Sequence, residues 1–215
     1  MRIYGISGLG ADKRVFNYLN INCEFIPIDW IKPLTNETIE NYSKRLSTVI
    51  DTTSEYAILG VSFGGLIAIE MSKFLNPKLT ILISSAETKS DLRLIYRLIG
   101  KSGLTKLVPQ SFMNPPKSIA HFIFGTKNKK LLNSILDDTD LEFAKWAVIK
   151  LTTWENEEKI NPILKISGTK DKLIPPTKDE NTIQIENGEH FMIVDNVFEI
   201  SQLINSKLKN SSLID

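Results

Sequence analysis

The stretch ILGVSFGGLIAIE, residues 58–70, sets one serine among glycines between two apolar segments. The residues before Ser62 are typical of a buried strand, whereas residues 65–75 are typical of a helix. A strand that passes into a helix through a turn this sharp strains the backbone at the serine, and Cβ atoms at Gly60 and Gly64 would collide across it. The turn would also place the Ser62 hydroxyl at the amino end of the helix, where free N–H groups favour negative charge. The stretch therefore predicts a raised serine at the end of a buried strand.

The rest of the chain alternates short apolar runs with helical patterns. Several of these runs are continuously apolar, which is typical of parallel strands covered on both faces. Strand followed by helix and then strand again predicts an α/β fold with a mostly parallel, twisted sheet of about six strands flanked by helices. The predicted strands are residues 2–7, 23–28, 56–62, 79–85, 162–167 and 182–186.

Two further helices are predicted beside these strands. Residues 36–50 carry apolar side chains at helical spacing, and Thr35 or Asn36 is suited to cap the first turn. Residues 196–209 are predicted to close the chain as a helix, with Asp195 or Asn196 as the cap.

The alternation is interrupted once, by a long segment in which only helices are predicted. A loop of some 75 residues without secondary structure would be unusual in a compact domain. We therefore expect an α/β core formed by residues 1–85 and 156–215, with residues 86–155 inserted as a helical cap or lid over one end of the sheet.

Composition limits the classes of protein that the chain can represent. Its 215 residues suffice for one well-buried domain. A net charge of +1 gives no overall basic field for nucleic acid or an anionic membrane, so neither is expected as a partner. The single cysteine, Cys23, fits a reducing compartment, and the chain shows neither a signal peptide nor an apolar run of 18 residues. We expect a cytoplasmic location, with no metal and no cofactor.

A serine hydroxyl is a weak nucleophile until a positioned base accepts its proton. The chain has two histidines. His190 follows the last predicted strand and therefore lies at the same sheet edge as Ser62. His121 lies among apolar residues of the helical segment, where packing explains it. His190 is accordingly the candidate base.

The base needs a carboxylate to orient its ring. Asp171 comes four residues after the fifth predicted strand, in a turn framed by glycine and proline. Glu87, after the fourth strand, is an alternative, whereas Asp195 is better explained as a helix cap. Ser62, Asp171 and His190 thus follow three different strands of the sheet.

Together, the motifs GVSFGG (60–65), GTKD (168–171) and GEHF (188–191) resemble those of the α/β-hydrolase superfamily over nearly the whole chain. The resemblance implies that Ser62 is the nucleophile, His190 the general acid–base and Asp171 its orienting carboxylate. It also implies an oxyanion hole formed by the backbone N–H of Phe63 and an N–H in the first loop, for which Leu9 is the candidate. Many relatives have His-Gly where this chain has Ser7-Gly8. We also expect no counterpart in this sequence to the opening β-hairpin of larger relatives.

These residues predict a serine hydrolase that cleaves an ester or thioester of a small to medium, largely apolar acyl group. Six aromatic residues of the insertion are candidate lining for the substrate pocket, with Trp146 and Trp154 foremost; the others are Tyr96, Phe112, Phe122 and Phe143. The fold also supports lyases, acyltransferases and non-catalytic binding or sensor proteins, and these alternatives stay open. A dinucleotide site at Gly8 and Gly10 is disfavoured because Lys13 stands where the third glycine of that motif is needed.

Overall fold

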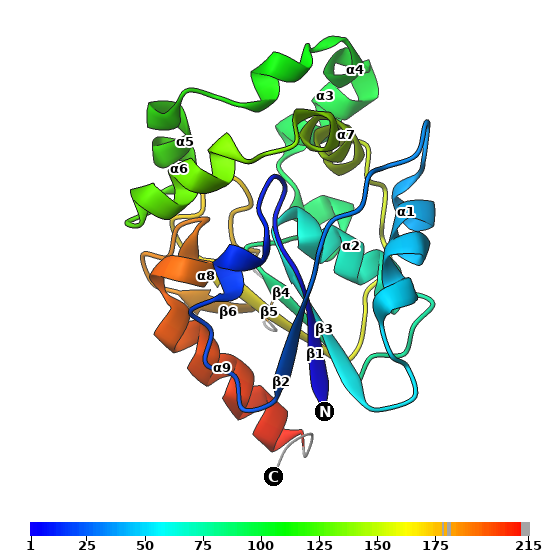
Figure 1. The fold of residues 1–215 in the computed structure, drawn as a ribbon, viewed down its shortest axis with the longest axis vertical. Helices are drawn as coiled ribbons and strands as arrows, with labels where there is room; N and C mark the ends of the chain where they lie inside the picture. The colour runs from blue at the N-terminus through cyan, green and yellow to red at the C-terminus, as the bar shows by residue number, and fades with distance from the viewer. Residues whose placement is uncertain (178, 180–181, 212–215) are drawn as a thin grey trace.

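The sheet that the sequence predicts is present in the computed structural model, which describes residues 1–177, 179 and 182–211. Six strands form one sheet in the order β2-β1-β3-β4-β5-β6, and every neighbouring pair runs parallel (Figure 1). The strands are β1 (Arg2–Ile6), β2 (Glu24–Ile28), β3 (Tyr56–Val61), β4 (Leu79–Ile83), β5 (Ile163–Gly168) and β6 (Thr182–Ile185). All six predicted strands are confirmed.

The central strands are apolar throughout because both of their faces are buried. Ala57 and Leu59 of β3 pack into one hydrophobic cluster, and Ile58 between them packs into another on the opposite face. All three side chains are inaccessible to solvent. Successive side chains of a strand point to opposite faces, so a strand that is covered on both sides needs an unbroken apolar run.

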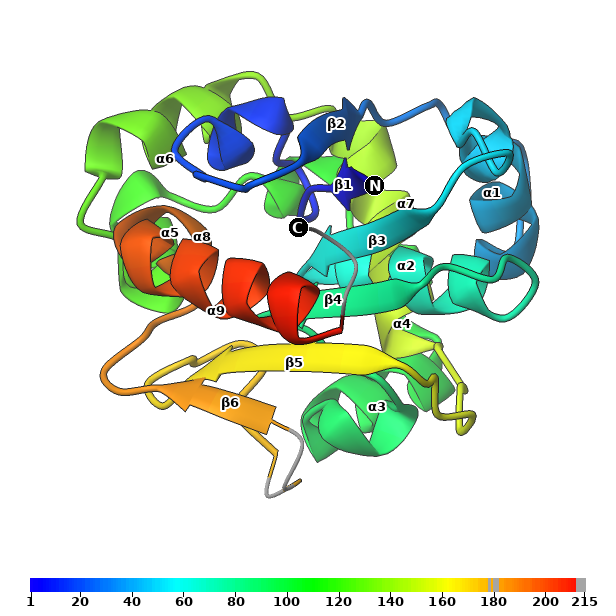
Figure 2. The ribbon, with the colours of Figure 1, turned by 90° about the horizontal axis from the view of Figure 1, so that it is seen from below.

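Helices cover the two faces of the sheet (Figure 2). One cluster joins the sheet to α1 (Ile39–Leu46), α2 (Phe63–Ser72) and α7 (Leu141–Thr152). The other joins it to the short α8 (Met192–Asp195) and to α9 (Val197–Asn210). A 3₁₀ turn, η1 (Lys13–Phe16), adds Val15 and Phe16 to this second cluster.

The segment between β4 and β5 is helical, and we call its residues 86–155 the insertion. Figure 1 shows it at the end of the molecule where the strands finish, away from both chain termini. Besides α7 it contains η3 (Lys89–Asp91), α3 (Leu94–Ser102), α4 (Leu104–Leu107), η4 (Gln110–Met113), α5 (Lys117–Phe124) and α6 (Lys129–Asp137). The insertion therefore stands over the sheet edge from which the candidate site residues project.

The helix caps differ from those expected. Thr38, in extended conformation, caps α1 and accepts a hydrogen bond from the N–H of Asn41 at 3.2 Å. Neither Thr35 nor Asn36 does so, because the helix starts one turn later than the apolar pattern suggested. Asn196 precedes α9 without a side-chain capping bond. Among the described residues, no helix combines the length and the apolar character needed to cross a membrane.

Candidate active site

Ser62 occupies the turn between β3 and α2 with a backbone conformation that non-glycine residues rarely adopt, φ 52° and ψ −122°. Two hydrogen bonds hold it there. The Ser62 N–H donates to the Ile83 carbonyl at 3.0 Å, and the Ser85 hydroxyl donates to the Ser62 carbonyl at 2.6 Å. Strain of this kind persists only where the surrounding structure fixes the backbone, and it is concentrated at functional sites.

The glycines around Ser62 are explained by close backbone approaches. A Cβ atom at Gly60 would collide with the carbonyl oxygen of Gly64, and one at Gly64 would collide with that of Ser7. At Gly65 the obstacle would be the Ser85 hydroxyl. The tight strand-to-helix turn thus excludes side chains at all three positions, which is the reason for the glycine pattern in the sequence.

His190 lies between β6 and α8 and faces Ser62. Its Nε2 atom is 2.9 Å from the Ser62 Oγ, and its Nδ1 atom is 2.8 Å from one carboxylate oxygen of Asp171 and 3.0 Å from the other. A carboxylate only accepts hydrogen bonds, so Nδ1 carries the proton and Nε2 is left to accept from the serine hydroxyl. His190 and Asp171 are both buried, with 4% of each residue exposed, so water competes little for these contacts.

Asp171 is positioned by its own turn. One of its carboxylate oxygens accepts hydrogen bonds from the N–H groups of Leu173, at 2.8 Å, and Ile174, at 2.9 Å. The turn lies directly against the segment before His190, because Gly168 and Gly188 approach so closely that a Cβ at Gly168 would collide with the Gly188 carbonyl. Two glycines therefore bring the carboxylate and the imidazole together.

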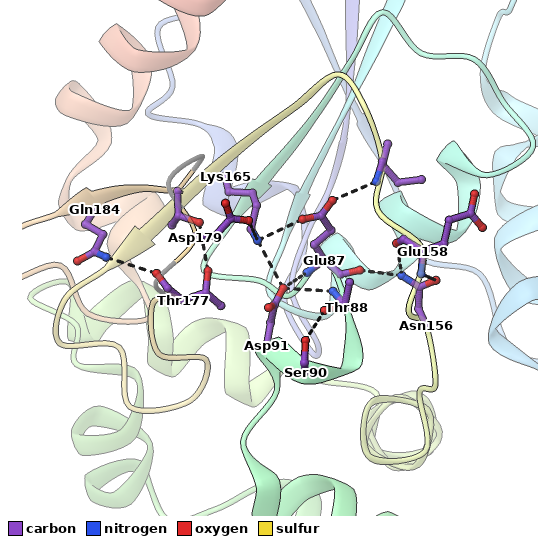
Figure 3. A network of polar contacts seen from close by, with 12 residues as sticks. Glu87, Thr88, Ser90, Asp91, Asn156, Glu158, Lys165, Thr177, Asp179 and Gln184 are labelled. Carbon is purple, nitrogen blue, oxygen red and sulfur yellow. Dashed lines mark hydrogen bonds and ion pairs between the residues drawn. The ribbon is translucent and has the colours of Figure 1, made fainter.

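The other two acidic candidates, Glu87 and Asp195, bind other partners than His190. Glu87 accepts from the N–H of Ile160 at 3.0 Å and pairs with the Lys165 ammonium at 3.2 Å, inside a polar network between the insertion and β5 (Figure 3). Asp195 accepts from the N–H of Lys127 at 2.7 Å. Of the three acids considered, Asp171 is the one that the structure places at the histidine.

Both predicted oxyanion donors lie next to Ser62. Phe63 is the first residue of α2, where backbone N–H groups have no partner within the helix. The Ser62 side chain does not cap this helix end either. Leu9 belongs to the loop after β1, and its neighbour Gly8 approaches so closely that a Cβ there would lie 3.4 Å from the Ser62 Cβ. Phe63 and Leu9 stay predictions as donors, in positions that suit the role.

A cavity of about 430 Å³ opens beside Ser62 and His190. Leu9 and Val61 line it from the sheet side. Its remaining wall is largely apolar and comes in good part from the insertion, including Tyr96, Ile99, Phe124, Val148 and Leu151. The cavity can hold an apolar group with one end at the serine.

Tyr96 is one of the few polar side chains in this wall. Burial raises the pKa of its phenol, which stays neutral and donates a hydrogen bond to the Leu173 carbonyl at 3.1 Å. Because Leu173 follows Asp171, this bond ties α3 of the insertion to the turn that holds the carboxylate.

Of the six aromatic residues that the sequence suggested for the pocket, Tyr96 lines the cavity, whereas the other five lie outside its lining: Phe112, Phe122, Phe143, Trp146 and Trp154. The ring of Trp146 lies 4.5 Å from that of Tyr42, tilted by 41°, and its indole N–H donates to the Glu37 carbonyl at 3.3 Å. Trp154 is buried with its indole N–H on the Glu70 carboxylate at 2.7 Å. Both belong to the hydrophobic cluster that contains α1 and α2 rather than to the cavity wall. The sequence pattern shows that such side chains are apolar but not what they pack against.

His121 is separate from the site. Its Nε2 atom contacts the Asn133 side chain at 2.7 Å, between α5 and α6. Within the described part of the chain, no three His, Cys, Asp or Glu residues are grouped as metal ligands would be.

No protein-family model and no curated protein matches the chain. Solved structures do resemble it. An esterase (EaEST) from Exiguobacterium antarcticum matches with a TM-score of 0.69 and 16% identity over 97% of this chain and 92% of its own. MenH from S. aureus matches with a TM-score of 0.72 and 17% identity over 99% and 94%. A lipase-esterase related protein from Clostridium acetobutylicum ATCC 824 matches with a TM-score of 0.70 and 14% identity over 95% of this chain and 93% of its own. The chain has the α/β-hydrolase fold.

Proposed function

We propose that the protein is a serine hydrolase that cleaves carboxylic esters or thioesters of small to medium, largely apolar acyl groups. One observation carries the proposal: Ser62, His190 and Asp171 form a continuous hydrogen-bonded chain whose serine end lies at an apolar cavity. The presence of an esterase among the structures of the same fold supports it.

The geometry suits acylation of Ser62. The Oγ atom attacks the carbonyl carbon of the substrate while His190 Nε2 accepts the hydroxyl proton, and Asp171 stabilises the imidazolium that forms. The N–H groups of Phe63 and Leu9 donate to the oxyanion, and each such donor is worth about 3 kcal/mol of barrier. The attack gives a tetrahedral intermediate, which then collapses. The leaving group departs with the proton from His190, and an acyl ester remains on Ser62.

Deacylation repeats these steps with water. His190 accepts a proton from the water molecule, the hydroxide adds to the acyl carbon, and the second intermediate releases the carboxylic acid. Ser62 recovers its proton from His190. Each proton transfer in the cycle passes through the Nε2 atom that contacts the serine.

Labelling with a fluorophosphonate probe tests the proposal. We expect mass spectrometry to find the adduct on Ser62 in the native chain and none in Ser62→Ala. A p-nitrophenyl ester panel of increasing acyl length, with matching thioesters, should then define the acyl preference. A folded native chain that neither reacts with the probe nor cleaves any panel member would overturn the assignment and favour a binding protein.

A further inference from the structure

The insertion contains a strongly basic segment. Residues 92–136 hold eight Lys and Arg residues and no Asp or Glu, whereas the rest of the chain holds 18 basic and 25 acidic residues. The near-neutral net charge of the chain is thus the sum of a positive region and a negative region. Seven of the eight basic side chains are exposed, and the eighth, Arg97, is half-buried. The positive charge is therefore available at the surface.

The same segment exposes large apolar side chains. In the part of the chain that the structure describes, fourteen large hydrophobic side chains are exposed, and eight of them lie between residues 94 and 122. Of these eight, the most exposed are Leu107 at 79%, Phe112 at 71% and Phe122 at 69%. Single apolar residues on a surface are common, but such a concentration on one segment marks an interaction site.

The helix α3 shows how the exposed residues are arranged. Tyr96 and Ile99 line the cavity, so the inner side of the helix is occupied. Leu94 and Leu98, one turn apart, are exposed, and so is Lys101 one turn further on. A surface helix normally presents polar side chains on this outer side. In α3 the outer side is apolar and basic.

The other elements of the segment repeat this arrangement. Thr105 of α4 and Phe124 of α5 line the cavity, while Leu107 and Phe122 of the same helices are exposed. Figure 1 places α3, α4 and α5 along one end of the molecule, opposite the chain termini. We call the exposed side chains of residues 93–122 the basic apolar face.

We propose that the basic apolar face docks on an anionic lipid surface. Elements that lie in a membrane interface combine Leu and Phe side chains, which enter the acyl boundary, with Lys and Arg, which pair with anionic headgroups. This face has both, and residues 93–122 include no Asp or Glu that headgroups would repel. An acid that does pair with it, Asp137, lies outside these residues and contacts Lys117 at 2.8 Å. The field of a molecule with one basic end would also orient that end toward the lipid. The net charge alone suggested no such partner, because it averages over the two regions.

A second copy of the chain fits this face less well. Pairing two such faces would bring like charges together, which costs several kcal/mol at an interface. An acidic protein would satisfy the charges but would leave unexplained why the side chains most exposed here are Leu and Phe. A lipid surface satisfies both features.

Co-sedimentation with vesicles tests the proposal. We expect the full chain to bind phosphatidylcholine vesicles that contain phosphatidylglycerol, and to release them when salt is raised. The double variant Lys101→Glu/Lys106→Glu should weaken binding by at least about tenfold, and Phe112→Ser by about fivefold. The matched controls are Lys44→Glu/Lys209→Glu, both exposed, and Phe198→Ser, whose side chain is 74% exposed on α9. Circular dichroism melting checks that each variant is folded.

The controls should bind within about twofold of the native chain. The proposal is overturned if no binding to anionic vesicles occurs at low salt. It is equally overturned if the control variants lose as much vesicle binding as the variants in the basic apolar face. It is also overturned if polyglutamate binds the face as tightly as the vesicles, which would indicate an acidic protein, or if Phe112→Ser converts a dimer into a monomer in gel filtration. None of these outcomes depends on hydrolysis at Ser62.

Discussion

The sheet region (residues 1–85 and 156–211) and the helical insertion use their apolar residues differently. Leu59 of β3 is inaccessible to solvent and contacts other buried side chains, whereas Leu107 of α4 is 79% exposed. The sheet region buries most of its apolar residues in its own core. The insertion divides them between the cavity wall and the outer surface. Stability should therefore depend mainly on the sheet region, and ligand contact on both.

The largest effect is expected for the carboxylate at His190, which comes from the sheet region. Asp171→Asn should lower kcat/KM for p-nitrophenyl acetate by more than about a hundredfold, because an amide no longer fixes the imidazole in the productive tautomer. His190→Ala should have an effect of at least this size. The matched control is Glu87→Gln, another buried acid, located where the insertion begins. Should Glu87→Gln remove activity and Asp171→Asn preserve it, the assignment of the orienting carboxylate would be wrong.

The two regions are joined by a buried ion-pair network, in which the next largest effect is expected. The Lys165 ammonium lies 3.2 Å from Glu87, 3.5 Å from Asp91 and 3.3 Å from Asp179 (Figure 3). Lys165→Met would leave the buried Glu87 carboxylate and two partly buried ones without this cation, which should lower the free energy of unfolding by about 3–5 kcal/mol. Adding Glu87→Gln to that variant should restore part of the loss in urea unfolding. A loss below about 1 kcal/mol would show that the network does not hold the regions together.

The same network predicts how stability changes at alkaline pH. Burial lowers the pKa of Lys165, but the carboxylates of Asp91 and Glu87 outweigh it and raise this pKa above its ordinary value. Since the folded state then holds the proton more tightly, the stabilisation is complete below about pH 10 and is lost as the pH rises through the folded-state pKa. Unfolding measured from pH 8 to 11.5 should show this decline in the native chain. A Lys165→Met chain that declines by the same amount would assign it to other groups.

Truncation of one leucine in each region should show a smaller difference in the free energy of unfolding. Leu59→Ala removes a fully buried side chain and should cost about 2–5 kcal/mol of unfolding free energy. Leu107→Ala makes the same chemical change on the surface of the insertion and should stay within about 0.5 kcal/mol. Equal losses in thermal or urea unfolding would contradict the proposed division of apolar residues between core and surface.

The sequence was sufficient to predict what depends on local patterns. Ser62 could be located because the glycine positions around it are fixed by steric contacts. The positions of the strands along the chain followed from unbroken apolar runs such as residues 56–61. Asp171 and His190 could be placed at the same edge because both follow parallel strands. Their contact with Ser62 depends on tertiary geometry that no local pattern specifies.

The helices of the insertion could be predicted, but not which of their apolar side chains would line the cavity. Trp146 and Tyr96 both lie on amphipathic helices, yet Trp146 packs on Tyr42 while Tyr96 faces the cavity. Helical periodicity identifies an apolar side without saying what covers it. The position of Thr38 as the cap of α1 was missed for a related reason, since several residues before the helix could have served.

The smallest expected effect concerns one buried hydroxyl in each region. Among the described residues, the hydroxyls of Ser43 in α1 and Thr105 in α4 are buried without a hydrogen-bond partner. Such a group loses its hydrogen bonds to water on folding and gains none in the protein. Ser43→Ala and Thr105→Val should therefore each raise the free energy of unfolding by about 1 kcal/mol. The network at Lys165 ties the insertion to β5, so both changes should shift the urea midpoint of a single transition. If Thr105→Val instead protects only α4 from hydrogen exchange and leaves the midpoint unchanged, the insertion opens independently, and the comparison between the regions becomes one between two folding units.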